Sequence, residues 1–259
     1  SAVDIRESWN GGFVLFCFIA TFFSITGVTV LSFFVVKREE RGEFVQGAYR
    51  SSAAILGIAF IQNIYGTSGM APLMIIGTVP LYNAFAVIVL SLLKPGQRKM
   101  DKALLQKTLK GIVTNPIILG IAAGFVWAIL KIPQPEILQK TVKNMAVLAT
   151  PLGLMAMGAS FEGKKALGKL KPTLIASALK LVVLAAIFLP IAVRLGYRES
   201  ELVAILVMLG SATTVSSFVM ARNMGHEGVL TSSIVMVTTL CSAFTLTGWL
   251  FLLKTLGLV

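Results

Sequence analysis

Long hydrophobic stretches make up most of this chain, and short polar segments separate them. A helix needs about 20 residues to cross the hydrocarbon of a bilayer. By that measure the pattern predicts eight spans in one domain. The stretches are far longer than the strands of a membrane barrel, so we expect an all-α integral membrane protein. The predicted spans cover residues 13–36, 44–65, 72–93, 111–130, 145–161, 174–195, 202–221 and 228–253.

Composition supports this fold class. Hydrophobic residues make up 56% of the chain and charged residues 13%, and the mean hydropathy is +0.86, values that a water-facing surface could not accommodate. The cysteines Cys17 and Cys241 lie in apolar stretches, and His226 is the only histidine. We therefore predict no disulfide framework, no metal site, no cofactor and no catalytic residues, and we do not expect an enzyme.

Two of the predicted spans resemble each other. SSAAILGIAFIQNIYGTSG at residues 51–69 aligns with SATTVSSFVMARNMGHEG at residues 211–228, from the serine as far as Asn63 and Asn223. Hydroxyl residues and glycines in the middle of a membrane span favour a helix that breaks. A pair of such helices in corresponding places of two halves is typical of the binding site of a secondary transporter.

A broken helix exposes the N-terminus of its second half, where free N–H groups and the positive end of the dipole attract anions. Hydroxyl groups around the two breaks, and one amide on the neighbouring span, would add hydrogen-bond donors. A purely structural role, in which the serines and threonines help the helices to pack, is the alternative. The predicted binding residues are Ser51, Ser52, Gly57, Asn83, Thr213, Thr214, Ser216 and Ser217.

Four further polar residues are candidates for a gating or supporting role. Arg50 stands at the inner edge of its span, where it would attract an anion, gate its passage or extend to the headgroups. Lys180 lies near the middle of its span, where a cation by default indicates a functional role. Asn63 and Asn223 precede glycines and would cap half-helices or contact a ligand.

Lysine and arginine are distributed unequally between alternate loops. Segments 37–43, 94–110, 161–171 and 222–227 carry fourteen of them, whereas the segments on the other side carry seven. Basic loops remain in the cytoplasm, so we predict that the loops 37–43, 94–110 and 161–171 face the cytoplasm of a multi-pass cell-membrane protein. The formal net charge of +12 then reflects topology and anionic lipid headgroups, and we expect no nucleic-acid partner.

Five short motifs in order resemble the auxin efflux carrier family, which includes bacterial malate and malonate permeases. They are GAYRSSAAILG at 47–57, VPLYN at 79–83, NPIILG at 115–120, ATPLGLMAMGASF at 149–161 and TTVSSFVMA at 213–221. The resemblance covers essentially the whole chain.

The resemblance implies a transporter of ten helices in inverted five-helix repeats, with crossing broken fourth and ninth helices. Two N-terminal helices would then precede this sequence. Residues 1–259 would form a single transmembrane transporter domain, with the end of the N-terminal repeat at 1–93, a cytoplasmic loop at 94–110 and the C-terminal repeat at 111–259. The resemblance also implies a homodimer. Because the family commonly carries a basic residue on a scaffold helix at the position of Lys180, the resemblance favours a structural or lipid-facing role for that lysine.

These observations predict a secondary transporter that moves small organic anions across the bilayer by alternating access. The resemblance implies carboxylates such as malate, malonate or auxin-like acids as substrates. A hydroxyl-lined anion channel and a non-transporting membrane receptor or scaffold are the alternatives. All eleven acidic residues lie in loops, tails or span ends, and ion-coupled carriers usually keep a carboxylate at membrane depth. We therefore favour transport driven by the solute gradient and the membrane potential.

Overall fold

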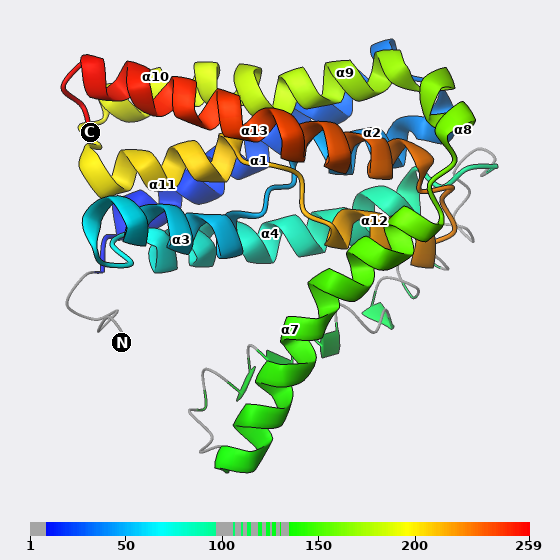
Figure 1. Ribbon diagram of the computed structural model, residues 1–259, viewed down its shortest axis with the longest axis horizontal. Coiled ribbons are helices and arrows are strands. Elements are labelled where there is room, and N and C mark those ends of the chain that lie inside the picture. Colours follow the sequence, from blue (N-terminus) through cyan, green and yellow to red (C-terminus); the bar gives the residue numbers. More distant parts are fainter. Residues whose placement is uncertain are drawn as a thin grey trace.

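A computed structural model describes residues 9–96 and 135–259, together with isolated positions between 106 and 130. In its described part, every element of regular secondary structure is a helix (Figure 1). Most of the predicted span at 111–130 and most of the predicted loop at 94–110 lie outside the described residues. The helices are α1 (Gly11–Val35), η1 (Arg38–Glu40), α2 (Arg41–Tyr49), α3 (Ala53–Tyr65), α4 (Ala71–Leu92), α7 (Glu136–Ala159), α8 (Gly163–Gly168), α9 (Leu170–Ala178), η2 (Leu179–Val183), α10 (Leu184–Arg194), α11 (Glu199–Gly210), α12 (Ser216–Asn223) and α13 (Val229–Thr255).

Five helical segments are long and apolar enough to cross a membrane: α1, α4, α7, α13 and the continuous run of α9, η2 and α10. They confirm five of the predicted spans, although α7 begins nine residues before the predicted start at residue 145. The predicted spans 44–65 and 202–221 are each two shorter helices. The all-α membrane fold is thus confirmed.

The first broken helix consists of α2 and α3, separated by residues 50–52, and the second consists of α11 and α12, separated by residues 211–215. Both linkers begin in extended conformation, with ψ of 128° at Arg50 and 164° at Ser211. The linkers meet, because the Ser52 N–H donates to the Ala212 carbonyl at 3.0 Å. The Thr213 hydroxyl also donates to the Gly47 carbonyl at 2.7 Å. The two breaks therefore cross at one place in the fold.

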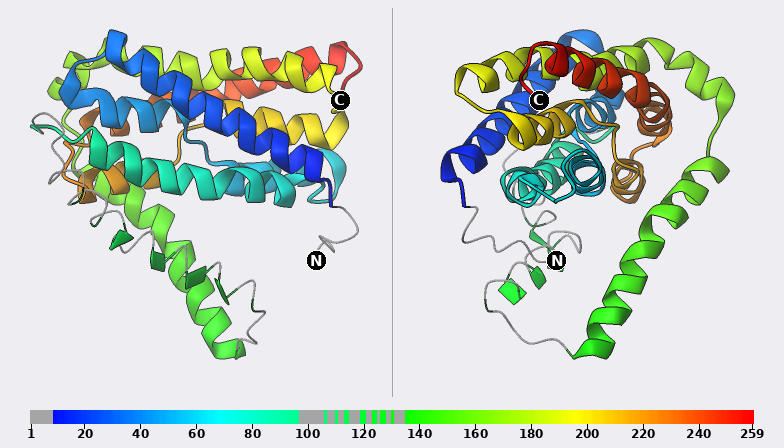
Figure 2. Two further views of the ribbon diagram at one scale, coloured as in Figure 1. Left: turned by 180° about the vertical axis from the view of Figure 1, so that it is seen from behind. Right: turned by 60° about the vertical axis from the view of Figure 1, so that its left-hand side comes forward.

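The two sets of helices run in opposite directions (Figures 1 and 2). α1 and α4 start at the end of the molecule where the described chain begins, whereas α9–α10 and α13 start at the opposite end. The broken helices are reversed in the same way, so that α3 lies beside α11 and α2 beside α12. Inverted repeats would produce such opposite directions, and the inverted five-helix repeats themselves stay a prediction.

Close packing holds α4 against α1. A Cβ atom on Gly77 would lie 2.8 Å from the Val14 carbonyl oxygen and 2.9 Å from the Cys17 Cβ. Only glycine leaves room for this approach, since backbone cannot move aside as a flexible side chain can. The contact fixes α4, which carries Tyr82 and Asn83 toward the crossing.

Apolar side chains face outward on several long helices. Phe34 on α1, Ile137 on α7 and Phe244 on α13 are 83%, 82% and 81% exposed. Large exposed apolar surfaces are unfavourable in water, and lipid is the solvent that suits them. α7 extends away from the other helices (Figure 2) and packs on α12, where a Cβ on Gly153 would lie 3.0 Å from Val215.

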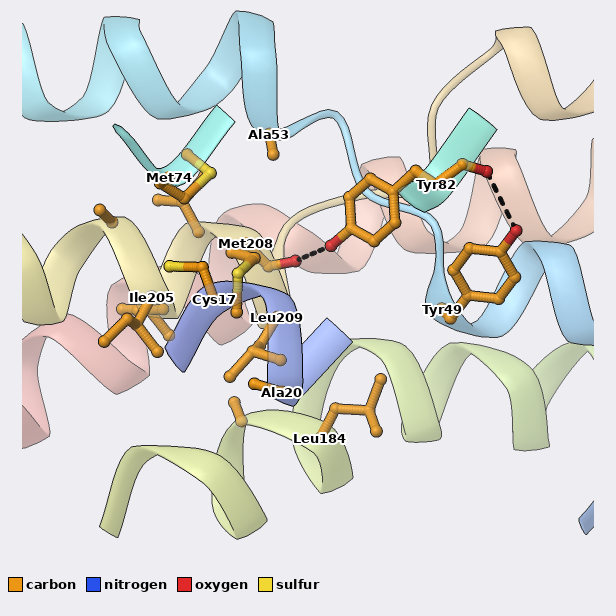
Figure 3. Close-up of a cluster of buried hydrophobic side chains, with 14 of the residues drawn as sticks. Cys17, Ala20, Tyr49, Ala53, Met74, Tyr82, Leu184, Ile205, Met208 and Leu209 are labelled. Atoms are coloured by element: carbon orange, nitrogen blue, oxygen red, sulfur yellow. Dashed lines mark hydrogen bonds between the residues drawn. The ribbon is translucent and has the colours of Figure 1, made fainter. Parts of the chain in front are cut away.

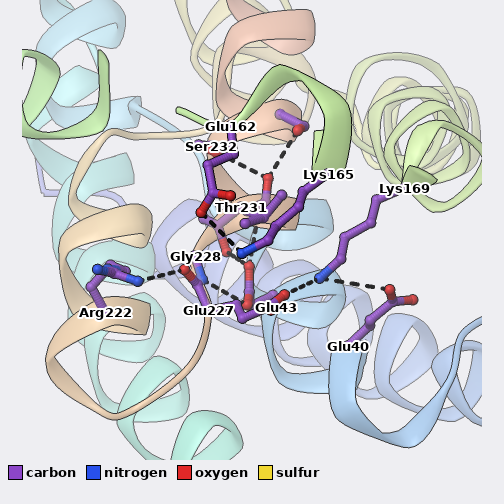
Figure 4. A network of polar contacts seen from close by, with 12 residues as sticks. Glu40, Glu43, Glu162, Lys165, Lys169, Arg222, Glu227, Gly228, Thr231 and Ser232 are labelled. Carbon is purple, nitrogen blue, oxygen red and sulfur yellow. Dashed lines mark hydrogen bonds and ion pairs between the residues drawn. The ribbon is translucent and has the colours of Figure 1, made fainter. Parts of the chain in front are cut away.

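Polar contacts join several segments at one end of the molecule (Figure 4). The Lys169 ammonium lies 2.6 Å from the Glu227 carboxylate and 3.8 Å from Glu40. Its hydrogen bond and its charge lower the pKa of the Glu227 carboxyl. The segments that meet here are the predicted cytoplasmic ones, since η1, α8 and the loop between α12 and α13 share this end.

Glu43 is the main correction to the sequence-based placement of the acidic residues. The sequence pattern places it in the loop 37–43, whereas it lies in the first turn of α2 and is 2% exposed. Its carboxylate accepts hydrogen bonds from the Gly228 N–H, the Thr231 N–H and the Thr231 hydroxyl, at 2.9, 2.9 and 3.0 Å. A carboxylate at this position satisfies the free donors at the N-terminus of α13 and complements its dipole.

Candidate functional site

A cavity of about 430 Å³ opens where the two breaks cross. Its walls come from both linkers, from the first turns of α3 and α12, and from the middle of α4 and α7. The lining residues are Arg50, Ser51, Ser52, Ala54, Val79, Tyr82, Asn83, Ala149, Thr150, Thr214, Val215, Ser216, Val219 and Met220.

Two helix N-termini reach this cavity. α3 begins after Ser52 and α12 begins after Val215, and neither N-cap side chain makes a capping hydrogen bond. The first N–H groups of a helix have no partner within the helix, and they carry the positive end of the dipole. Both ends therefore bring positive potential to the same space, and at α12 the Ser217 and Phe218 N–H groups already donate to the Thr214 and Val215 carbonyls, at 3.0 Å each.

Arg50 supplies a full positive charge to the cavity. Its side chain is 5% exposed, and its guanidinium donates to the Asn83 amide oxygen at 2.5 Å and contacts the Met220 sulfur at 2.6 Å. Both partners are neutral, and within the described part of the chain no carboxylate pairs with Arg50. A buried cation whose partners are only neutral groups favours an anionic ligand.

Tyr82 links the cavity to the second break (Figure 3). Its hydroxyl donates to the Met208 carbonyl at 3.0 Å. The same hydroxyl accepts a hydrogen bond from the Ser51 hydroxyl at 3.3 Å. The Tyr49 hydroxyl in turn donates to the Tyr82 carbonyl at 3.2 Å. The tyrosine ring is thereby held in one place between the two broken helices.

The structure brings together most of the residues that the sequence singled out. Five of the eight predicted binding residues line the cavity, and so does Arg50, whose guanidinium contacts Asn83 and Met220. Those five are Ser51, Ser52, Asn83, Thr214 and Ser216.

The other three predicted binding residues lie close by, outside the lining. Thr213 is buried, with its hydroxyl on Gly47 and its N–H on the Thr238 hydroxyl. Ser217 is fully buried in α12. Gly57 is one turn into α3, where a Cβ would lie 2.7 Å from the Met74 methyl group. Gly57 therefore serves close packing of α3 on α4.

The three remaining candidates lie away from the cavity. Asn63 and Asn223 are exposed, near the outer ends of α3 and α12. Glycines supply the left-handed turns at those ends, with φ of 73° at Gly66 and 83° at Gly225. Lys180 is fully buried and donates to the Met208 and Leu209 carbonyls, so the lipid-facing alternative is wrong for it.

Sequence reasoning missed Tyr82 and Thr150 as site residues. Both lie in motifs that carry the family resemblance, at 79–83 and 149–161, but a single aromatic or hydroxyl residue in a membrane helix gives no signal of its own. Only the packing of α4 and α7 on the crossing brings these two side chains to the cavity.

The described residues contain no group of three or more histidine, cysteine or acidic side chains that could hold a metal ion. The site therefore consists of hydroxyls, amides, backbone N–H groups and one guanidinium. Such a set binds anions by hydrogen bonding and charge.

A family model described as "Membrane transport protein" matches residues 8–250 of the chain. The chain belongs to this family. The match confirms the resemblance to auxin efflux carriers and extends over both broken helices and the long helices around them. No curated protein matches the chain. Membership makes the protein a membrane transport protein, and its apolar helices agree with a multi-pass arrangement in the bilayer.

Proposed function

We propose that this membrane transport protein is a secondary transporter of small organic anions that carries a carboxylate through the crossing by alternating access. One observation carries the proposal. The Arg50 guanidinium, bonded only to neutral groups, lines a cavity at which two uncapped helix N-termini meet. Preorganised N–H donors together with a guanidinium are the arrangement that binds a carboxylate.

The rest of the cavity suits the remainder of a small acid. Val79, Val215 and Val219 offer apolar contacts, while Ser52, Thr214 and Ser216 offer hydroxyls. At about 430 Å³ the cavity falls within the size range of sites for small molecules. Malate, malonate and auxin-like acids are the candidates that the family suggests.

The crossing also supports movement between two states. A short linker joins the two halves of each broken helix, and few hydrogen bonds hold the crossing together. Half-helices joined by extended segments can tilt as units around a fixed site, which is the usual basis of alternating access.

The test is uptake of labelled malate, malonate and indole acetate into liposomes that contain the purified protein. We expect saturable uptake of at least one acid, acceleration of uptake by the same acid loaded inside, and weaker uptake by Ser52→Ala. Ser68→Ala provides the control, because this serine is only partly exposed and lies in the turn that follows the same helix, away from the cavity.

Three outcomes would contradict the proposal. Flux that rises linearly with substrate and shows no exchange would indicate the channel. Binding of an acid without flux would indicate a receptor. Uptake that is equal in both serine variants and the unaltered protein would place the site elsewhere.

A further inference from the structure

We infer that the Lys180 ammonium is a built-in cation for the second break: it neutralises the C-terminal end of α11 and, through a shared carbonyl, positions Tyr82 at the cavity. This inference rests on the proposed function and deepens it. It assigns the Lys180 ammonium to the position at which many carriers with broken helices bind a coupling cation. The consequence is that transport needs no metal cation at this break.

The carbonyls at the end of α11 need donors from outside the helix. The Ser211 N–H donates to the Val207 carbonyl at 3.2 Å, and the chain then becomes extended. The next carbonyls, Met208 and Leu209, therefore have no helical partner. They also carry the negative end of the helix dipole, and they are buried, with 0% and 2% exposure.

Lys180 supplies these donors. Its ammonium lies 2.6 Å from the Leu209 carbonyl and 3.3 Å from the Met208 carbonyl, and the residue is fully buried. In the described part of the chain, no carboxylate pairs with it. The ammonium therefore interacts with the end of a half-helix in the way that a bound sodium ion does in other carriers with broken helices.

The local geometry of the lysine helix fits this role. Lys180 lies in η2, a π-helical segment that interrupts the run from α9 to α10. Such single-turn insertions are rare and recur at functional sites. The end of α11 approaches η2 closely, since a Cβ on Gly210 would lie 3.6 Å from the Leu181 carbonyl oxygen. The π-helical segment therefore packs at ordinary van der Waals distance from the end of α11, and this brings the ammonium to the break.

The same carbonyl connects Lys180 to the cavity. Met208 accepts hydrogen bonds both from the Lys180 ammonium and from the Tyr82 hydroxyl, and Tyr82 accepts from Ser51 and lines the cavity. Lys180 does not line the cavity, so it acts as a positioning residue. Loss of the ammonium would free the Met208 carbonyl to move, and Tyr82 and Ser51 with it.

The experiment compares Lys180→Ala, Lys180→Met and a control, Lys171→Met, whose lysine is exposed at the start of α9. The alanine variant leaves room for a small ammonium ion, whereas the methionine variant fills the space with a neutral side chain. Methylammonium chloride and tetramethylammonium chloride are added to each protein at equal ionic strength, and thermal unfolding and uptake are measured.

We expect both Lys180 variants to unfold at a lower temperature and to raise the substrate concentration for half-maximal uptake about tenfold or more, because hydrogen bonds to charged groups are strong. Methylammonium should restore both properties in Lys180→Ala only. A double-mutant cycle with Tyr82→Phe should show non-additive effects on half-maximal uptake, which a role in stability alone would not produce.

Several outcomes would overturn the inference. One is unfolding and uptake in Lys180→Met that match the unaltered protein, and another is rescue of Lys180→Ala by tetramethylammonium as strong as that by methylammonium. A third is additive effects of the Lys180 and Tyr82→Phe substitutions. The fourth is loss of uptake by the unaltered protein when N-methylglucamine replaces sodium. The unfolding measurements need no substrate. If the protein transports no carboxylate, the proposed function fails, while rescue of stability by methylammonium still decides the role of Lys180.

Discussion

At both breaks an extended linker joins two half-helices, but the cation near each break comes from a different part of the chain. In the first, the residue that follows α2 is itself a cation, Arg50, and its guanidinium lines the cavity. In the second, the linker begins with the buried Ser211, and the cation comes from another helix, as Lys180. The first break thus presents its charge to a ligand, whereas the second keeps its charge behind the helix end.

This difference explains the polarity of the crossing. Both half-helix C-termini lie near a buried cation, and both half-helix N-termini lack a side-chain cap. Their positive ends thus remain available at the cavity, and Arg50 adds to them. Opposite helix directions alone would bring as much negative as positive dipole to the crossing. The two cations shift that balance toward binding an anion.

The strongest test of the comparison removes the charge at the first break. Arg50→Gln should lower carboxylate uptake about tenfold or more, because charged hydrogen bonds to a ligand contribute roughly 1.5–3 kcal/mol. The control is Arg222→Gln, since Arg222 is exposed and bonds the Glu227 carbonyl. Uptake by Arg50→Gln that matches the control would show that the first break does not bind the anion.

A second test separates the contact between the breaks from the cavity surface. Thr213→Val removes the hydroxyl that donates to the Gly47 carbonyl and leaves that carbonyl unpaired, which costs about 1–3 kcal/mol of stability. Thr214→Val alters the cavity lining instead and should leave stability nearly unchanged. Unfolding in detergent measures both, and equal stability of the two variants would contradict the structural role of Thr213.

Two neighbouring serines test which face of α12 contacts the ligand. Ser216 is exposed to the cavity, whereas Ser217 is fully buried in α12. Ser216→Ala should weaken substrate affinity a few-fold, corresponding to roughly 0.5–1.5 kcal/mol for one hydrogen bond. Ser217→Ala should leave affinity unchanged. Competition by unlabelled acid measures affinity in each variant, and the reverse order would mean that α12 presents another face to the ligand.

The smallest effect concerns the loop that follows the second broken helix. Lys169 lowers the pKa of the Glu227 carboxyl, so this pair stabilises the fold above the ordinary glutamate pKa of about 4.3. That contribution is lost as the pH falls through the lowered pKa. Because Glu227 is exposed, we expect only a small fall in unfolding temperature below about pH 4.

The matched variants for this loop are Lys169→Met and Glu227→Gln. Each substitution should remove the fall in unfolding temperature that comes from the Lys169–Glu227 pair, and should leave the acid dependence that comes from other groups unchanged. A pH series of unfolding temperatures for the three proteins measures the difference. An identical acid dependence in all three would show that the pair contributes nothing to stability.

The internal resemblance of residues 51–69 and 211–228 predicted that two helices break and that they belong to one site. It did not fix where the aligned residues lie. Ser51 and Ser211 stand at the breaks, but the asparagines at positions 63 and 223 lie near the far ends of the half-helices, where glycines end them. A pattern of small polar residues cannot tell a break from a helix end, because both use the same residue types.

The sequence by itself determined the membrane class, the positions of the long helices and the pair of broken helices, because these follow from hydrophobic length and local residue chemistry. The tertiary structure decided which polar groups face one another. It turned Arg50 into the cavity, buried Glu43 at the start of α13, and set Lys180 on the carbonyls that end α11. These roles depend on contacts between residues far apart in the chain, and no local pattern encodes such contacts.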